Sequence, residues 1–335
     1  MNDGQADNAE LRRKIMGFMV SQAICAVSEL GVPDHLAAGP LAVRDLADAV
    51  RADPDALARF LRVLAAEGLF TEQEPGVFAL ATLGRLLRTE VPGSLRHFAA
   101  LMSDEAYTVW GAAAHAVRTG EPAFEHVFGL PYFGWLAENP DAAARFNAAQ
   151  AGLVELRLLP LLEWNWAGVR AVVDVGGGNG LLLARLLERH PHLRGIVFDL
   201  PQVMSEAAKE TWAATGVARR VEGVAGDFFA GVPEGADVYV LSQILHDWND
   251  ERAAAILRRC HHAVPAHGRV LVLEQVLDEV REPDPAALLD LHMLVLLGGR
   301  ERTATGWAEL LSRSGFSLGG IRYGPRSALI EAIPV

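Results

Sequence analysis

The stretch DVGGGNG, Asp174 to Gly180, decides the fold, because it ends a short apolar run and leads into a helical pattern. Glycines at 176, 178 and 180 remove side chains where a strand turns sharply into a helix, so backbone N–H groups can approach a ligand closely. A tight turn explains one or two glycines, but four of the five residues 176–180 are glycine. The dinucleotide pattern G-x-G-x-x-G is not matched, because Leu181 stands three residues after Gly178. A pyrophosphate cradle is therefore disfavoured.

Short apolar runs alternate with helical patterns from Ala171 onward, which predicts a parallel sheet with helices on both faces. Near the end, FSLGGIRY and SALIEAI predict a closing pair of strands. The second half of the chain is therefore expected to be a doubly wound α/β domain. The five expected parallel strands are AVVDV (from 171), GIVFD (195), RVEGVAGD (220), DVYVLS (237) and RVLVLEQ (269).

Residues 11–165 show helical periodicity almost throughout. Asp53-Pro54 predicts a helix start and Gly68 a helix end, and LFTEQEPGVFALATLG then predicts a β-hairpin around a Pro-Gly turn. This order is that of a winged helix. Its candidate recognition helix, residues 54–67, has no net charge, which disfavours DNA binding. The segment LRRKIMGFMVSQAICAVSELGV is apolar on most faces, so a packing and dimerisation module is favoured.

Composition places the chain among soluble cytoplasmic proteins. It has 335 residues and a formal net charge of −12, which argues against a surface that binds nucleic acid or an anionic membrane. Cys25 and Cys260 are the only cysteines, which indicates a reduced, intracellular protein. The first ten residues are polar and acidic, unlike a signal peptide, and the apolar run from Leu288 is too short to span a bilayer.

Acidic residues at the ends of the next two strands predict an adenosine site. Asp199 ends the second strand, where a carboxylate can accept both ribose hydroxyls. Asp227 follows the third strand and can accept from an exocyclic amine, while Phe228 offers a face for a purine. Because the glycine loop contains no Lys or Arg to bind phosphate, the pattern points to S-adenosylmethionine (SAM), an adenosine without phosphates.

The ordered set VVDVGGGNG, FDLP, GDFF, LSQILHDWND and GGRERT resembles the caffeic acid and hydroxyindole O-methyltransferase family, over about residues 17–327. The resemblance implies a class I methyltransferase domain with a seven-stranded sheet at residues 166–335. Residues 1–165 are then a winged-helix dimerisation domain that forms a homodimer. It further implies methyl transfer from SAM to a hydroxyl of an aromatic small molecule, in bacterial secondary metabolism. S-adenosylhomocysteine (SAH) is then the second product, and no metal is implied.

The resemblance also assigns roles to single positions. His246 matches the general base, and Glu274 and Glu301 match the two acids that orient it. With an ordinary pKa of about 6.5, His246 is expected to be largely neutral at neutral pH. The expected cofactor ligands are Gly176 and Gly178 for the methionine portion, Asp199 for the ribose, Asp227 and Phe228 for the adenine, and Ser242 where plant relatives carry a lysine. The acceptor pocket is expected to include Asn147, Met293, Phe146, Trp110 and Phe133.

Other interpretations of these residues remain open. Asp199 can cap a helix that begins at Pro201, Asp247 and Asp250 stand where helix caps belong, and Trp248 is expected to pack rather than react. Two other functions also remain. One is a SAM-binding relative with different chemistry, such as hydroxylation or decarboxylation, although the presence of His246 disfavours it. The other is a winged-helix regulator that senses an adenosine ligand.

Overall fold

The computed structural model describes residues 3–204, 206–277 and 285–335. The chain forms two compact units, one of Met1–Thr108 with Ala148–Gly152 and the other of Val109–Asn147 with Leu153–Val335. The domain boundary expected between residues 165 and 166 stays a prediction. Among the described residues, no single helix is long and apolar enough to cross a membrane; one bent pair, Gln5–Glu29 with Val32–Ala38, passes a test of length and composition alone.

The N-terminal unit contains the predicted winged helix. Asp53 caps the central helix by accepting a hydrogen bond from the backbone N–H of Ala56 at 2.8 Å, and Gly68 follows it with φ of 78°. The hairpin turns at Gly76, and a third short strand extends it in the order β1-β3-β2. The elements are α1 (Asp3–Ile15), α2 (Gly17–Glu29), α3 (Val32–His35), η1 (Leu36–Ala38), β1 (Leu41–Ala42), α4 (Val43–Val50), α5 (Pro54–Ala66), β2 (Phe70–Glu74), β3 (Val77–Leu80), η2 (Gly84–Leu87) and α6 (Arg96–Ser103).

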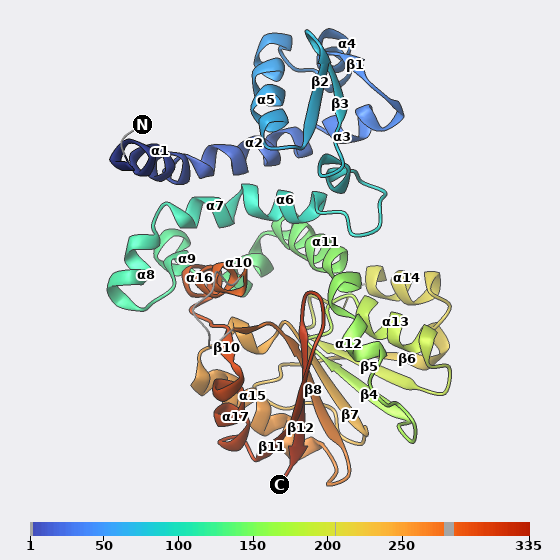
Figure 1. Cartoon of the computed structure of the whole chain (residues 1–335). Coiled ribbons are helices and arrows are strands. Elements are labelled where there is room, and N and C mark those ends of the chain that lie inside the picture. The colour runs from blue at the N-terminus through green and yellow to red at the C-terminus, as the bar shows by residue number, and fades with distance from the viewer. Residues whose placement is uncertain (1–2, 205, 278–284) are drawn as a thin grey trace. The chain divides into compact units, whose positions relative to one another are not determined.

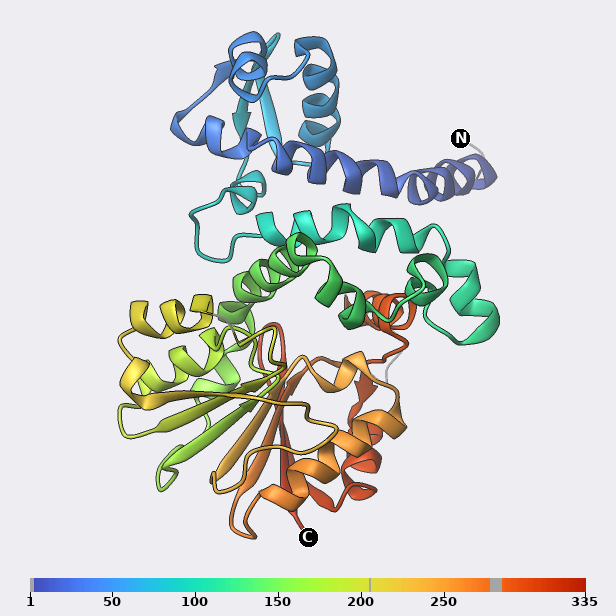
Figure 2. The same ribbon diagram turned by 180° about the vertical axis from the view of Figure 1, so that it is seen from behind.

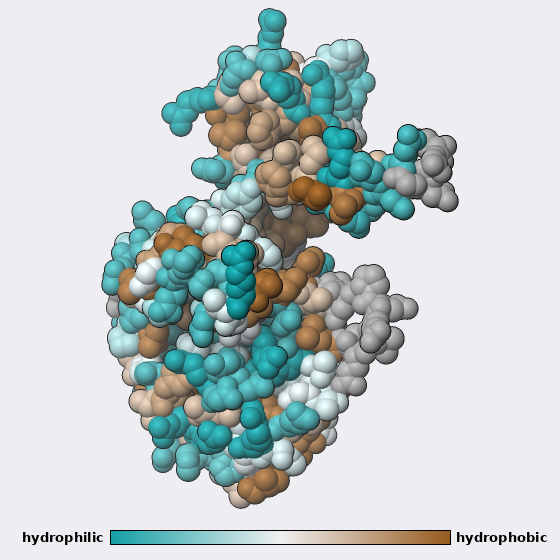
Figure 3. Space-filling model, turned by 90° about the vertical axis from the view of Figure 1, so that its left-hand side faces the viewer, coloured by the Kyte–Doolittle hydropathy of each residue, from teal (hydrophilic) through white to brown (hydrophobic). Residues whose placement is uncertain are grey.

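The apolar N-terminal segment forms two helices, α1 and α2, instead of one. The break falls at Met16, directly before Gly17, a residue type that disfavours helix interiors. Large apolar side chains on these helices remain in solvent, and hydrophobic atoms gather on the surface of this unit in Figure 3. Arg62 on α5 is paired with Glu72 at 3.0 Å, which occupies one of the few basic groups of the candidate recognition helix.

The second unit begins with a run of short helices. They are α7 (Glu105–Trp110), α8 (Ala113–Thr119), α9 (Ala123–Phe128), α10 (Tyr132–Glu138), α11 (Pro140–Arg157) and α12 (Leu159–Leu162). Two of these helices also contribute to the first unit: most of α7 and the middle of α11 belong to it. Helix α16 (Pro285–Leu297), from far along the sequence, packs against α8 and α9.

The rest of the second unit is the predicted doubly wound sheet. Seven strands lie in the order β11-β12-β8-β7-β4-β5-β6, and only β12 runs antiparallel to its neighbours (Figure 1). The strands are β4 (Ala171–Val175), β5 (Arg194–Asp199), β6 (Val221–Ala225), β7 (Val238–Ser242), β8 (Arg269–Glu274), β11 (Phe316–Tyr323) and β12 (Ala328–Pro334). Two short strands, β9 (Val276–Leu277) and β10 (Arg302–Thr303), pair separately.

Helices cover both faces of this sheet, as Figure 2 shows from behind. Successive strand residues point to opposite faces, so Val172 packs with α13 (Leu181–Arg189) and α14 (Glu206–Ala214), whereas Val173 packs with α15 (Asp250–Ala263) and α17 (Ala304–Ser312). Two further short helices, η3 (Ala218–Arg220) and η4 (Leu245–Asp247), complete the unit. The carboxyl ends of β4, β5, β7 and β8 carry the residues of the candidate site.

Candidate active site

The glycine loop after β4 has the backbone that its sequence predicts. Gly176, Gly178 and Gly180 all have positive φ, at 72°, 60° and 73°. A Cβ on Gly176 would collide with the side chain of Ile244, whereas a Cβ on Gly178 would meet no atom within 4 Å. The loop is therefore tight on its inner side at Gly176 and open at Gly178, where the backbone can approach a ligand.

The acids of the predicted adenosine site lie around this loop. Asp199, at the end of β5, accepts hydrogen bonds from the backbone N–H groups of Gly178 at 2.8 Å and Leu200 at 2.7 Å. Burial raises the pKa of Asp199, against the lowering effect of these two donors. Asp227 is exposed and accepts from the N–H of Phe229 at 2.8 Å. Helix α14 starts at Glu206, so Asp199 does not cap a helix at Pro201.

Several buried polar atoms near the loop suit a bound cofactor. Among the described residues, the Ser242 hydroxyl, Asp174 Oδ2 and the Trp248 indole N–H are buried without a hydrogen-bond partner. Because a buried polar group without a partner costs free energy, such groups are suited to a ligand. Burial and then the charge of Asp199 raise the pKa of Asp174 to about 7, although Arg157 lowers it. Asp174 and Asp199 thus place two carboxyl groups against the glycine loop, one below Gly177 and one on the N–H of Gly178.

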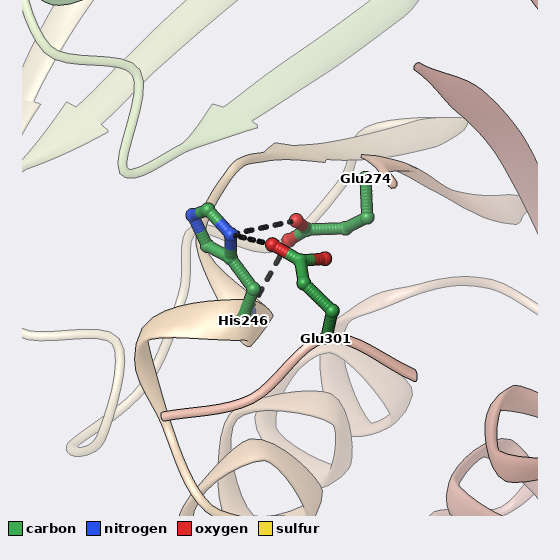
Figure 4. A group of neighbouring side chains, drawn as sticks. All are labelled: His246, Glu274 and Glu301. Atoms are coloured by element: carbon green, nitrogen blue, oxygen red, sulfur yellow. Dashed lines mark hydrogen bonds and ion pairs between the residues drawn. The ribbon is translucent and has the colours of Figure 1, made fainter. Parts of the chain in front are cut away.

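The three predicted catalytic residues meet in one buried cluster. His246 comes from η4, Glu274 from the end of β8, and Glu301 from the segment before β10 (Figure 4). The Nδ1 atom of His246 lies 2.6 Å from Glu301 Oε1 and 3.6 Å from Glu274 Oε2. The other ring nitrogen, Nε2, points away from both glutamates. A carboxylate at Nδ1 fixes the tautomer with hydrogen on Nδ1, which leaves the Nε2 lone pair of a neutral ring available.

The first glutamate also shapes the backbone on which His246 stands. Glu274 Oε1 accepts from the N–H groups of Ile244 at 3.0 Å and Leu245 at 2.9 Å. Gln243 adopts φ of 56° at this point, and its side-chain amide donates to Glu274 Oε2 at 3.1 Å. Glu274 therefore holds the turn that carries His246 as well as facing its ring.

The charges of this cluster change the proton affinity of His246. Burial alone would lower the pKa of His246, but the carboxylates of Glu274, Asp247 and Glu301 together raise it to about 10. The expectation that His246 is largely neutral at neutral pH is therefore wrong, because three carboxylates surround a ring that is only 5% exposed. Burial raises the pKa of Asp247 to about 7, with His246 opposing and the two glutamates adding to the rise.

His246, Glu274 and Glu301 could also offer three ligand atoms within 4.8 Å of one another to a metal ion. Most of these atoms already have protein partners, because Glu274 accepts from backbone and amide N–H groups and Glu301 Oε1 faces His246. Of the four carboxylate oxygens of Glu274 and Glu301, Oε2 of Glu301 is the one buried without a hydrogen-bond partner. The absence of a metal stays a prediction, and the hydrogen bonds favour an orienting role for both acids.

The residues expected for the acceptor pocket fall into two groups. Phe133 lies 6.1 Å from Phe146 and 6.2 Å from Trp248, measured between ring centroids, which ties α10 and α11 to the segment after His246. Trp110 contacts helix α16 next to Met293, which is buried. Asn147 is exposed on α11, and in the described part of the chain no hydrogen bond or ion pair joins its side chain to either group.

A cavity of about 810 Å³ lies on another side of Glu301. Its walls come mainly from α17 and from Asp250, Arg300, Arg302 and Arg313, and neither His246 nor Glu274 lines it. Because it does not reach the imidazole, we do not place the acceptor there.

Comparison with known proteins identifies the family. A family model for an O-methyltransferase domain matches residues 110–317, and a model for an O-methyltransferase dimerisation domain matches residues 13–90. The chain belongs to the O-methyltransferase family. The predicted resemblance, the O-methyltransferase class of enzyme and the presence of a dimerisation domain are thereby confirmed.

Relatives of this O-methyltransferase share both its length and its fold. The phenazine O-methyltransferase PhzM of Lysobacter antibioticus is 44% identical over 309 residues, covering 92% of this chain and 90% of the relative. The crystal structure of NcsB1, an O-methyltransferase from neocarzinostatin biosynthesis, in complex with SAM and 2-hydroxy-5-methyl naphthoic acid, has a TM-score of 0.82 at 35% identity. That match covers 94% of this chain and 96% of NcsB1. The predicted fold class is confirmed.

One relative shows that membership of the family does not by itself fix the chemistry. The aclacinomycin 10-hydroxylase RdmB of Streptomyces purpurascens is 35% identical over 322 residues, covering 93% of this chain and 85% of RdmB. The reaction of this O-methyltransferase therefore depends on the residues of its site as well as on its family.

The sequence pattern missed some residues of this O-methyltransferase site. Asp247 and Asp250 were expected as helix caps, but Asn249 caps α15 by accepting from the N–H of Arg252 at 3.0 Å. Asp247 Oδ1 instead lies 3.3 Å from His246 Nε2, and Asp250 pairs with Arg302 at 3.0 Å. The adjacency of Asp247 to His246 in the sequence was the available signal.

A further acid of this O-methyltransferase, Asp290 on α16, was also missed. It accepts from the backbone N–H of Glu301 at 2.8 Å and so fixes the segment that carries that acid. Because eleven residues separate Asp290 from Glu301, no local spacing pattern predicts this hydrogen bond.

Proposed function

We propose that His246 is the general base when this O-methyltransferase methylates a hydroxyl of an aromatic small molecule, with Glu274 and Glu301 as its positioning acids. The methyl donor is SAM, which supplies a methyl group on a positively charged sulfur that is already activated for in-line displacement. One observation carries the proposal: the ring of His246 is held at Nδ1 by Glu301 at 2.6 Å, so Nε2 is directed away from both acids.

The proton balance explains how His246 acts although its pKa is about 10. At neutral pH its ring carries a proton in the free protein. A phenolic acceptor has a pKa of about 10 as well, so inside the site a neutral imidazole with a phenol and an imidazolium with a phenolate are similar in free energy. His246 therefore favours the nucleophilic phenolate, either by taking its proton or by pairing with it. One proton leaves the site in each turnover.

Asp247 is placed to take part in that proton release. Its Oδ1 lies 3.3 Å from His246 Nε2, and its pKa of about 7 allows it to gain and lose a proton at neutral pH. The two glutamates stay on the Nδ1 side, where they stabilise the imidazolium and fix the ring. Positioning of the acceptor hydroxyl against the methyl group supplies the remaining part of the rate enhancement.

The residues of the cofactor site are part of the same proposal. Gly176 and Gly178 would hold the methionine portion, Asp199 the ribose, and Asp227 with Phe228 the adenine, while Ser242 offers its unpartnered hydroxyl. The adenine assignment is supported by Phe228, a half-buried ring that lies 6.2 Å from Trp248 and borders Gly176.

The acceptor pocket is proposed to lie between the two aromatic groups, with Phe133 and Phe146 on one side and Trp110 and Met293 on the other, and Asn147 at its edge. An aromatic acceptor in bacterial secondary metabolism is supported by PhzM and NcsB1, whose names refer to phenazine and to a naphthoic acid ligand. A cytoplasmic location is proposed because Cys25 and Cys260 are both free thiols.

The experiment that tests the proposal uses the purified full-length protein with methyl-labelled SAM and a panel of hydroxylated aromatic compounds. Label transfer to oxygen, with a mass gain of one CH₂, is the expected result. Hydroxylation is the second candidate because RdmB is similar, and it would add one oxygen instead. Products with added oxygen and no label would overturn the assignment as an O-methyltransferase reaction.

A further inference from the structure

One histidine near the site is fixed in a single tautomer by a tryptophan. The indole N–H of Trp110 donates to His292 Nδ1 at 3.1 Å, and the two rings lie within 6° of parallel. An indole nitrogen is a donor only, so Nδ1 of His292 must act as an acceptor. A neutral imidazole that accepts at Nδ1 carries its hydrogen at Nε2. His292 therefore offers one N–H donor.

His292 lies on α16, a helix that packs beside the candidate site. Helix α16 contacts η4, which carries His246, and Asp290 of the same helix accepts from the N–H of Glu301. Burial, and then the nearby charge of His246, lower the pKa of His292 to about 4. His292 is thus neutral at neutral pH, unlike His246. In the described part of the chain, no hydrogen-bond partner of its Nε2–H is found.

On the function proposed above, we propose that His292 determines which acceptor is methylated, by donating its Nε2–H to a second polar atom on the aromatic ring system. The fitting acceptors carry a lone-pair atom, such as a ring nitrogen, a carbonyl or a carboxylate oxygen, besides the hydroxyl that receives the methyl group. A hydrogen bond of this kind also sets which hydroxyl faces His246. His292 is thus a specificity-determining residue, and Trp110 positions it.

A packing role is the competing explanation, because the Trp110 contact joins α7 to α16 whatever the acceptor is. The two explanations differ in their effect on matched ligands. If His292 only packs, its replacement weakens every acceptor alike. If it donates a hydrogen bond, its replacement removes the advantage of acceptors that have the second polar atom.

The test measures the Kd of naphthol and of hydroxyquinolines, which share a bicyclic frame and differ by one ring nitrogen. It uses full-length protein loaded with SAH, in the presence of a chelator. The wild type should bind at least one hydroxyquinoline isomer about 3- to 10-fold more tightly than naphthol, which is the effect of one hydrogen bond. His292→Phe keeps a ring but removes the donor and should bring this ratio to about 1, whereas His292→Gln keeps an N–H donor and should retain part of it. Equal ratios in wild type and His292→Phe, or no isomer that binds better than naphthol, would overturn the proposal.

Nitrogen NMR on histidine-labelled protein supplies a second readout. His292 should show a protonated Nε2 and no titration near neutral pH, and Trp110→Phe should allow both tautomers. A protonated Nδ1 in the wild type would overturn the assignment. The Kd ratio tests the role of His292, whereas methyl transfer tests the proposed function. If His292→Phe still transfers the methyl group and its Kd ratio equals that of the wild type, the role of His292 is rejected and the role of His246 is not affected.

Discussion

Replacing Glu301 by glutamine should lower the proton affinity of His246, because it neutralises a carboxylate 2.6 Å from Nδ1 while keeping its size. The surrounding acids raise the pKa of His246 from 6.5 to about 10, which amounts to about 5 kcal/mol at about 1.4 kcal/mol per tenfold change in proton affinity. Three carboxylates share this effect and also offset the burial of the ring. For Glu301→Gln we expect the pKa of His246 to fall by about 1 to 2.

The same change should reduce kcat, by about 10- to 1,000-fold. An amide cannot stabilise an imidazolium as a carboxylate does. Its NH₂ group can also donate to Nδ1, which would place the ring hydrogen on Nε2 and block that nitrogen as a base. The affinity for SAH should stay within about twofold of wild type, because a charge on the far side of His246 is not a proposed cofactor ligand.

The assay follows the imidazole signals of His246 by NMR during a pH titration and measures methyl transfer on the same samples. Glu309→Gln serves as the matched control, because Glu309 is exposed on α17 and is the same residue type. An unchanged pKa of His246 in Glu301→Gln, with kcat also within twofold of wild type, would refute the positioning role of Glu301.

Three further outcomes are expected. Gly178→Ala should weaken SAH binding and lower the free energy of unfolding by only about 1–2 kcal/mol, because of the positive φ at this position. Gly176→Ala should destabilise the fold more, because its Cβ would also collide with the side chain of Ile244. Equal unfolding midpoints of the two variants would contradict this. Phe18→Glu should shift a dimer toward monomer in light scattering, because Phe18 is 49% exposed on α2; Val117→Glu, at a position 82% exposed on α8, is the control. Because the raised pKa of His246 leaves little neutral imidazole at neutral pH, kcat/KM for a phenol should rise with pH by up to about tenfold per pH unit below the pKa values of base and acceptor. A flat profile from neutral to alkaline pH would show that neither group limits the reaction.

Much of the fold was predictable because it depends on local patterns. The Asp53-Pro54 cap, the Pro-Gly turn and the short apolar strands each follow from one continuous segment, and the structure contains each of them. The break at Met16 was not predicted, because the apolar pattern continues across it. A single weak helix former, Gly17, was the only local signal.

The site was predictable only where a family motif marks residues that meet in the tertiary structure. His246, Glu274 and Glu301 were found through the family resemblance, and the structure brings them together although 55 residues separate the first from the last. The contact of Trp110 with His292 joins residues 182 positions apart, and no local pattern predicts it. The pKa of His246 was also mispredicted, because proton affinity depends on how many carboxylates surround a buried ring, and that number is set by the tertiary fold.

The most direct test of the central claim is the kcat of His246→Ala at neutral pH with two acceptors of different acidity. With an ordinary phenol we expect kcat to fall by about 10²- to 10⁴-fold, while the Kd of SAH stays as in wild type. With a nitro-substituted phenol, which is already ionised, the loss should be less than about tenfold, because no proton has to be removed. The role of His246 as general base would be contradicted if the alanine variant had the wild-type kcat with the ordinary phenol, or if its kcat fell by the same factor with both acceptors.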